Sequence, residues 1–111
     1  MSIRTIFHPE LFRDRVALVT GGGTGIGFRT ATELAYLGCT VYIASRNTKR
    51  LEEAATAINK YLQGHPTAGA VIPVELNIRD RSSRTRCIDT ILEKEKQIDY
   101  LVGYRLCILR E

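Results

Sequence analysis

The residue pattern with the clearest chemical potential is Thr-Gly-Gly-Gly-Thr-Gly-Ile-Gly, at positions 20–27. It follows a short apolar run that is typical of a buried strand, and it precedes apolar residues at helical spacing. A turn from a strand into a helix needs glycine where φ is positive and where a phosphate approaches the backbone. The unpaired N–H groups at the start of the helix then bind the anion. The pattern therefore predicts a phosphate-binding turn, and the alternative is a glycine-rich turn without a ligand.

The spacing of the glycines distinguishes between nucleotide-binding motifs. A P-loop that begins at Gly22 has Phe28 where a lysine would contact the phosphates, which argues against hydrolysis of ATP or GTP. The pattern Gly-x-Gly-x-x-Gly fails in every register, because its last position holds Ile26, Phe28 or Thr30. The pattern that remains is Thr-Gly-x-x-x-Gly-x-Gly.

Strands and helices that alternate along the chain must position this turn. Compact apolar runs predict strands at Arg15–Val19, Val41–Ala44, Ala70–Leu76 and Ile98–Val102. Helical spacing predicts a helix over Gly25–Leu37, a second whose apolar stripe begins at Leu51 and runs to Gly64, and a third capped by Ser82 or Ser83. Alternation of this kind indicates an α/β fold with a parallel sheet and right-handed crossovers.

The expected architecture is the N-terminal half of a Rossmann doubly wound sheet, β-α-β-α-β-α-β, with strand order 3-2-1-4. Pro73 interrupts the third strand, and a proline is tolerated where its nitrogen faces away from a partner strand. In this order the third strand lies at the edge of the sheet. The proline therefore agrees with the predicted topology.

The glycine pattern resembles that of the short-chain dehydrogenase/reductase family, and the resemblance extends through residues 16–19 before it and Ala44-Ser45-Arg46 after it. Within the family, the stretches 11–16, 43–46 and 71–79 are similar to peroxisomal trans-2-enoyl-CoA reductases and the related 2,4-dienoyl-CoA reductases. This resemblance implies that a full-length parent is an oxidoreductase of fatty acid metabolism. Its implied reaction is the NADPH-dependent reduction of an enoyl-CoA, with an acyl-CoA as substrate.

The end of the second strand predicts the choice of cofactor. A site that prefers NAD places a carboxylate there, about twenty residues after the glycines, to accept from the ribose 2′-hydroxyl. This chain has Ser45 followed by Arg46. A guanidinium pairs with a 2′-phosphate and stacks on adenine, which predicts NADP(H) as cofactor. The alternative for Arg46 is a solvated loop arginine.

The resemblance also implies that Asn77 and Ile78 border the adenine, although Asn77 alone suits a turn equally well. We expect no metal ligand and no catalytic residue in this chain. The predicted cofactor-binding residues are Thr20, Gly21, Thr24, Gly25, Ile26, Gly27, Ser45, Arg46, Asn77 and Ile78.

The family resemblance holds to about Val102. A family member continues there into Asn-Asn-Ala-Gly or Asn-Asn-Gly-Gly, whereas this chain continues as Gly-Tyr-Arg-Leu-Cys-Ile-Leu-Arg-Glu. The family's catalytic serine and Tyr-x-x-x-Lys pair do not occur in the sequence either, so we expect binding of the cofactor without turnover. We interpret residues 1–14 as a lead-in, 15–102 as a partial dinucleotide-binding domain and 103–111 as a divergent tail.

Three functions stay open at this point. The chain is the cofactor-binding half of an NADPH-dependent reductase, a non-catalytic nucleotide-binding module, or a truncated product without a function of its own. Its length of 111 residues, with 44% hydrophobic and 25% charged residues, suits one small globular domain. The oligomeric state is left open.

Composition argues against several other partners. The net charge of +4 is spread along the chain without aromatic clusters, so no nucleic acid is expected. The densest basic patch, Arg79, Arg81, Arg84 and Arg86, is interpreted as a solvated loop and helix start. The alternative is a site for a polyanion, and phosphate-bearing ligands stay open. The cysteines form no Cys-x-x-Cys pair and the two histidines stand apart, so neither a disulfide framework nor a metal site is predicted.

The expected compartment is the cytoplasm. The sequence has no apolar stretch long enough for a signal peptide or a membrane span, so no membrane association is expected. The last three residues, Leu-Arg-Glu, do not match a peroxisomal address, although a full-length parent would be consistent with a peroxisomal location.

Overall fold

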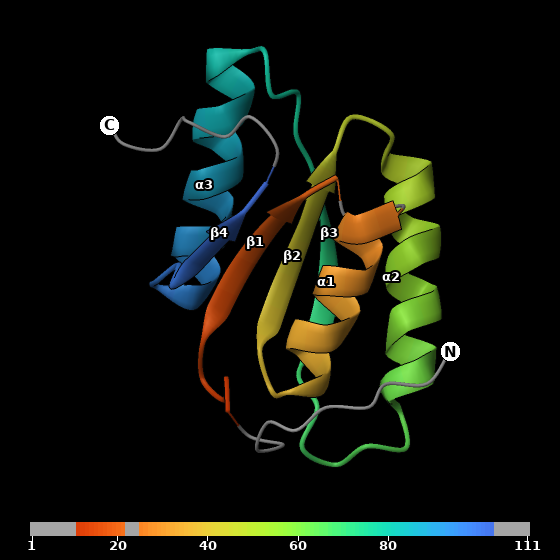
Figure 1. The fold of residues 1–111 in the computed structure, drawn as a ribbon. Coiled ribbons are helices and arrows are strands. Elements are labelled where there is room, and N and C mark those ends of the chain that lie inside the picture. The colour runs from red at the N-terminus through yellow and green to blue at the C-terminus, as the bar shows by residue number, and fades with distance from the viewer. Residues whose placement is uncertain (1–10, 22–24, 104–111) are drawn as a thin grey trace.

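A computed structural model of the chain describes residues 11–21 and 25–103. In these residues, strands and helices alternate, and the strands run parallel in one sheet of order β3-β2-β1-β4 (Figure 1). The predicted α/β architecture and strand order are therefore confirmed. The elements are β1 (Val16–Thr20), α1 (Gly25–Tyr36), β2 (Thr40–Ser45), α2 (Thr48–Leu62), β3 (Ala70–Glu75), α3 (Arg81–Glu95) and β4 (Tyr100–Val102).

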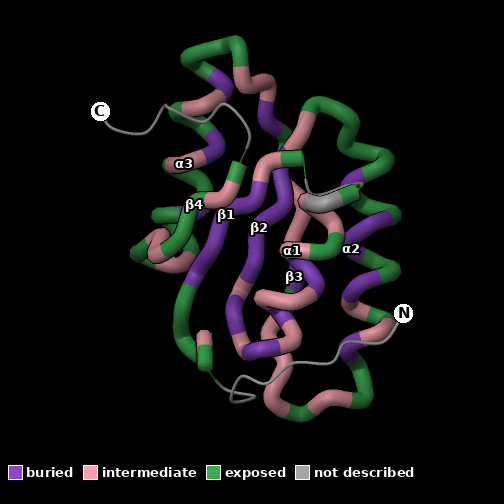
Figure 2. Tube along the Cα trace, in the orientation of Figure 1, coloured by how far each residue is buried: buried purple, intermediate pink, exposed green. Residues whose placement is uncertain are grey.

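The sheet is covered on both faces because side chains alternate along each strand. In β1, Ala17 and Val19 belong to the apolar cluster under α1 and α2, whereas Val16 and Leu18 belong to the cluster under α3. Figure 2 shows that the buried residues follow β1 and β2 through the middle of the molecule. Burial on both faces explains why these strands appear in the sequence as continuous apolar runs.

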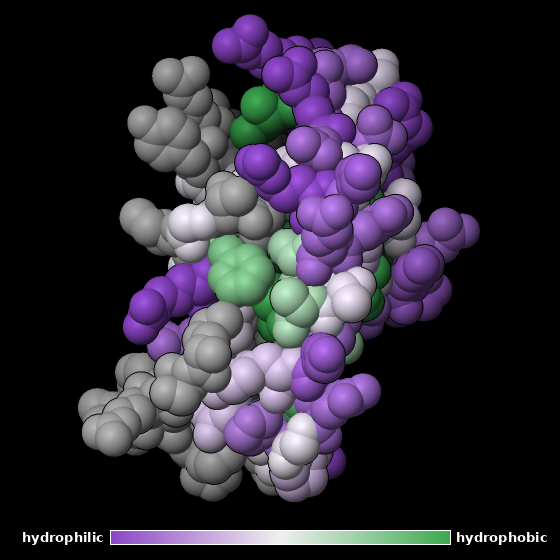
Figure 3. All heavy atoms as spheres, turned by 90° about the vertical axis from the view of Figure 1, so that its right-hand side faces the viewer, coloured by the Kyte–Doolittle hydropathy of each residue, from purple (hydrophilic) through white to green (hydrophobic). Residues whose placement is uncertain are grey.

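The outward face of α2 is hydrophilic. Its apolar stripe packs toward the sheet, while Glu52, Glu53 and Lys60 are exposed, and Figure 3 shows a largely hydrophilic surface on this side of the molecule. The helix begins at Thr48, before the first residue of the predicted apolar stripe, because the Asn47 side chain caps it. The Asn47 Oδ1 accepts a hydrogen bond from the backbone N–H of Arg50 at 3.0 Å.

The prediction that Ser82 or Ser83 caps α3 is wrong, because Asp80 is the N-cap residue. The Asp80 Oδ1 accepts a hydrogen bond from the backbone N–H of Ser82 at 3.0 Å. Its carboxylate also suits the positive end of the helix dipole better than a neutral hydroxyl does. Ser83 is instead buried in the first turn, with a different partner that is described below.

The outer edge of β3 is closed by α2. Asn59 Nδ2 donates to the Val71 carbonyl oxygen, and the Val71 N–H donates to Asn59 Oδ1, both at 2.9 Å. Residues two apart in a strand point their backbone groups to the same side, so the nitrogen of Pro73 also faces outward. The interpretation of Pro73 as an edge residue agrees with this geometry, because its missing N–H removes no hydrogen bond to β2.

Tyr42 joins the sheet to α3 from a fully buried position. Its hydroxyl donates to Glu95 Oε2 at 2.7 Å. Burial, followed by the hydrogen bond and charge of Glu95, raises the pKa of Tyr42 to about 12. The hydroxyl is therefore protonated at physiological pH and remains a donor to the carboxylate.

Asp99 aligns β4 with β1. Its Oδ2 accepts from the backbone N–H of Val16 at 2.8 Å, and its own N–H donates to the Val16 carbonyl at 2.7 Å. The Asp99 carboxylate also accepts from Gln97 Nε2 at 2.6 Å and lies 3.5 Å from an Arg15 guanidinium nitrogen. The bond from Val16 is the main cause that lowers the pKa of Asp99 below its ordinary value of 3.8.

We expect the melting temperature of Asp99→Asn to fall less steeply than that of the unsubstituted chain as the pH is lowered into the acid range. The folded pKa lies below the unfolded one, so the carboxylate stabilises the fold above pH 3.8. This contribution is lost as the pH falls through the lower folded pKa. Melting temperatures measured from about pH 2 to 7 should be lower for the variant at neutral pH and converge with the unsubstituted chain at low pH. Asp89→Asn, on the exposed surface of α3, is the matched control. Parallel profiles for Asp99→Asn and the unsubstituted chain would contradict this role.

The backbone makes a close crossing at Gly69, just before β3. The Gly69 N–H donates to the Ala35 carbonyl at 2.8 Å, and a Cβ on Gly69 would overlap the carbonyl group of Cys39. The neighbouring atoms belong to the backbone and have little room to shift. This crossing holds the loop after α2 against the loop after α1.

Gly69→Ala should destabilise the fold by about 1–3 kcal/mol, the usual range for overpacking. Gly64→Ala is the control, because a Cβ at Gly64 would have no neighbour within 4 Å. Urea denaturation of the three chains measures the difference. Equal loss of stability in both variants would show that the crossing at Gly69 is not the cause.

Candidate dinucleotide site

The glycine turn lies between the end of β1 and the start of α1. Gly21 has φ +73° and Gly25 has φ +59°, values that side chains other than glycine rarely adopt. A Cβ at either position would meet nothing within 4 Å, so backbone conformation and open space, not crowding by protein atoms, characterise both positions. The Gly21 N–H donates to the Ala44 carbonyl at 2.8 Å, which ties the turn to the end of β2.

The structure describes only some of the other residues predicted to belong to this turn. Gly25 and Gly27 belong to the first turn of α1. Thr24 and the side chain of Ile26 lie outside the described residues. Thr20 is the last residue of β1 and is half-buried.

Arg46 lies in the turn that directly follows β2. Ser45 Oγ accepts from the backbone N–H of Asn47 at 3.2 Å, and the Ser45 carbonyl accepts from Leu76 N–H at 2.9 Å. These bonds fix the backbone on both sides of Arg46, whose side chain is exposed. Ser45 thus connects β2, the cap of α2 and the end of β3.

The loop after β3 is held by side chains of α3. Ser83 Oγ accepts from the Asn77 N–H at 2.8 Å, and an Arg84 guanidinium nitrogen donates to the Ile78 carbonyl at 2.8 Å. Asn77 Oδ1 accepts from the Arg79 N–H at 3.1 Å, and the Asn77 carbonyl accepts from the Asp80 N–H at 3.0 Å. Asn77 therefore forms a turn with its side chain, one of the two roles considered for it.

The basic patch lies on a loop and a helix start, as interpreted from the sequence, but its four arginines differ in their surroundings. Arg79, Arg81 and Arg86 are exposed, and of these three only Arg79 lines the pocket. Arg84 is half-buried and donates to a backbone carbonyl. The pattern of arginines in the sequence carries no signal for this difference, because it depends on which residues face the loop.

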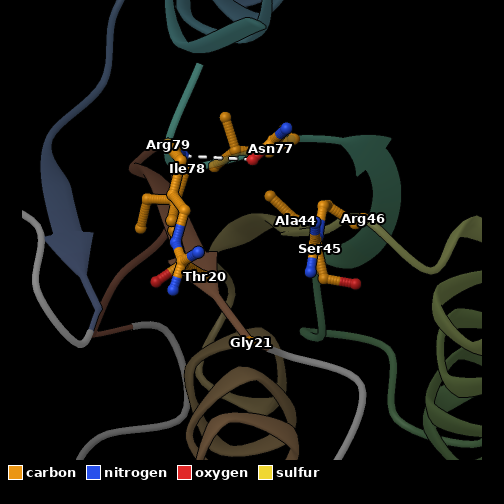
Figure 4. Close-up of a pocket in the computed structure, with 9 residues that line it drawn as sticks. Thr20, Gly21, Ala44, Ser45, Arg46, Asn77, Ile78 and Arg79 are labelled. Atoms are coloured by element: carbon orange, nitrogen blue, oxygen red, sulfur yellow. Dashed lines mark hydrogen bonds between the residues drawn. The ribbon is translucent and has the colours of Figure 1, made fainter. Parts of the chain in front are cut away.

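A cavity of about 270 Å³ lies at the carboxyl ends of β1, β2 and β3 (Figure 4). In parallel α/β sheets this is the edge at which ligands bind. Six of the predicted cofactor-binding residues line it, and the remaining three, Ala44, Leu76 and Arg79, were not predicted from the sequence. The complete lining is Thr20, Gly21, Ala44, Ser45, Arg46, Leu76, Asn77, Ile78 and Arg79.

The described cysteines are unsuited to nucleophilic chemistry. Cys39 and Cys87 are buried and unpaired, and burial is the main cause that raises the pKa of Cys39 to about 12 and that of Cys87 to about 11. Across residues 11–21 and 25–103, no three His, Cys, Asp or Glu side chains gather in a way that would hold a metal ion. None of the helices described is long and apolar enough to cross a membrane.

The chain is similar to known proteins in both sequence and fold. The family profile described as short chain dehydrogenase matches residues 15–103. The peroxisomal 2,4-dienoyl-CoA reductase of Danio rerio is 34% identical over 98 residues, which span 88% of this chain and 31% of that protein. The chain thus spans about a third of the length of this relative.

Two solved structures share the arrangement of the sheet. A citronellol catabolism dehydrogenase of Pseudomonas aeruginosa PAO1 has a TM-score of 0.78 and 36% identity, over 87% of this chain and 38% of that one. A complex of Pseudomonas aeruginosa RhlG with NADP has a TM-score of 0.74 and 27% identity, over 88% of this chain and 37% of that one.

The parallel sheet, the glycine turn and the pocket at the strand ends have the arrangement typical of Rossmann folds. The chain belongs to the short-chain dehydrogenase family, an oxidoreductase family that binds nicotinamide dinucleotides. The predicted family membership and the predicted likeness to 2,4-dienoyl-CoA reductases are confirmed.

Proposed function

We propose that this chain binds NADP(H) as the cofactor-binding part of a reductase. The observation that carries the proposal is the position of Arg46, which lines the pocket directly after β2, where an NAD site would hold a carboxylate. None of the described residues that line the pocket is Asp or Glu. A 2′-phosphate would therefore meet a guanidinium without a competing negative charge.

The residues at hand fit the adenosine end of the cofactor. Gly21 and Gly25 leave open space where a diphosphate approaches the start of α1. In this proposal Ser45 and Arg46 hold the 2′-phosphate, and Asn77 and Ile78 border the adenine. A cavity of about 270 Å³ is smaller than the usual range for a whole ligand, about 300–1,000 Å³, and suits part of the dinucleotide.

In the full-length parent, we propose the NADPH-dependent reduction of an enoyl-CoA. Support comes from the dienoyl-CoA reductase relatives, which this chain matches over about a third of their length. The bound nicotinamide supplies a hydride, and the reaction also needs a positioned proton donor. The sequence contains no Tyr-x-x-x-Lys pair, so we propose binding without turnover for this chain alone.

The compartment of this chain stays a prediction. The name of the Danio rerio relative describes that protein as peroxisomal. Within the proposed function, a peroxisomal location applies to the parent enzyme and a cytoplasmic one to this chain.

Arg46→Ala should raise the dissociation constant for NADPH about five- to twentyfold, with little change for NADH, because only NADPH carries the 2′-phosphate. Calorimetric titration of both nucleotides measures the effect. Arg50→Ala is the control, since Arg50 is exposed nearby on α2 and does not line the pocket. Equal weakening for both nucleotides would remove the 2′-phosphate role. If the unsubstituted chain binds neither nucleotide, the proposal itself fails.

The chain alone should not oxidise NADPH when a trans-2-enoyl-CoA is added. The physical reason is the missing proton donor beside the nicotinamide. Absorbance of NADPH is followed with protein that has first been shown to bind the nucleotide, and a reaction without protein gives the background. Oxidation above that background would refute the need for the Tyr-x-x-x-Lys pair.

A further inference from the structure

We propose that Arg79 is a second phosphate-binding residue of the pocket, which pairs with the 5′-diphosphate of the dinucleotide while Arg46 pairs with the 2′-phosphate. This inference rests on the proposed function and adds a residue to it. Two arginines, Arg46 and Arg79, line one cavity.

The two arginines approach the pocket from opposite sides. Figure 4 shows the Arg79 side chain extending from the loop after β3 toward Thr20, whereas Arg46 lies beside Ser45 at the end of β2. Thr20 and Gly21 lead into the turn before α1, where the diphosphate of a dinucleotide lies in this type of fold. Arg79 is therefore on the diphosphate side, and Arg46 is on the side of the ribose 2′-position.

The backbone that carries Arg79 is already ordered. Its N–H donates to Asn77 Oδ1 at 3.1 Å, drawn as a dashed line in Figure 4. Arg84 fixes the preceding residue through the Ile78 carbonyl at 2.8 Å. A ligand would therefore have to order only the side chain of Arg79, which lowers the entropic cost of the contact.

The charge of Arg79 is available for a ligand. Its guanidinium has no hydrogen bond or ion pair with the part of the chain that the structure describes. The neighbouring carboxylate, Asp80, is engaged as the cap of α3. Two cations on opposite sides of the pocket match an adenosine that carries phosphate at both its 5′ and its 2′ positions.

Two fragments of the cofactor separate the roles of the two arginines. Adenosine 5′-diphosphate carries only the 5′ phosphates, and adenosine 2′-monophosphate carries only the 2′ phosphate. We expect Arg79→Ala to weaken binding of the first about three- to tenfold and to leave the second nearly unchanged, as for loss of one charge-assisted contact that is partly exposed to solvent. Arg46→Ala should have the opposite pattern.

The titrations use the full chain and are followed by nuclear magnetic resonance, because fragments bind weakly. Arg81→Ala is the charge-matched control, since Arg81 is exposed at the start of α3 and does not line the pocket. The melting temperature of Arg79→Ala should equal that of the unsubstituted chain, because the side chain has no polar partner to lose among the described residues.

The outcomes separate this inference from the proposed function. If the unsubstituted chain binds both fragments and Arg79→Ala binds the 5′-diphosphate as well as Arg81→Ala does, the role of Arg79 is overturned and the proposed function stands. If Arg79→Ala loses the 2′-monophosphate instead, the assignment of the two arginines to the two phosphates is overturned. If the unsubstituted chain binds neither fragment nor NADPH, the proposed function fails and this inference fails with it.

Discussion

The rest of the structure depends on the burial of β1 on all sides. The strand pairs with β2 along one edge and with β4 along the other, and its two faces pack against separate helical layers. A strand in this position has no freedom to slip, since a shift of one residue would exchange its two apolar faces. Its carboxyl end, at Thr20, is thereby fixed in space. The glycine turn that follows therefore begins at a fixed position.

Neighbouring strand ends complete the pocket through backbone contacts. Gly21 bonds the end of β2 at Ala44, and Ser45 bonds the end of β3 at Leu76. The three strand ends are thus linked in a row, and the pocket forms along that row. This polar site lies at the edge of an apolar core. Among the described residues, every buried side-chain nitrogen or oxygen atom has a hydrogen-bond partner.

The two edge strands of the sheet, β3 and β4, differ in how far their edges are covered. Pro73 and the bidentate amide of Asn59 occupy the outer side of β3, which blunts an edge that would otherwise offer free backbone groups. At the opposite edge, β4 carries Tyr100 and Leu101, which are 37% and 38% exposed. Asp99, directly before β4, bonds the start of β1, and Val102 packs against the apolar cluster under α1 and α2. A charged side chain therefore helps to align this exposed edge strand with β1.

The sequence by itself determined the strand order, the glycine turn and the family. These features depend on local periodicity, on spacing within a few residues and on the position of Pro73, all of which can be read along the chain. Arg46 was predicted for the same reason, since its proposed role follows from its distance to the glycines. Only the tertiary structure decided that Asp80 caps α3, that Ser83 and Arg84 hold the loop after β3, and that Asn59 closes an edge. It alone separated Arg79 from Arg81, because two solvated arginines in a sequence differ only in where their side chains point once the loop is folded.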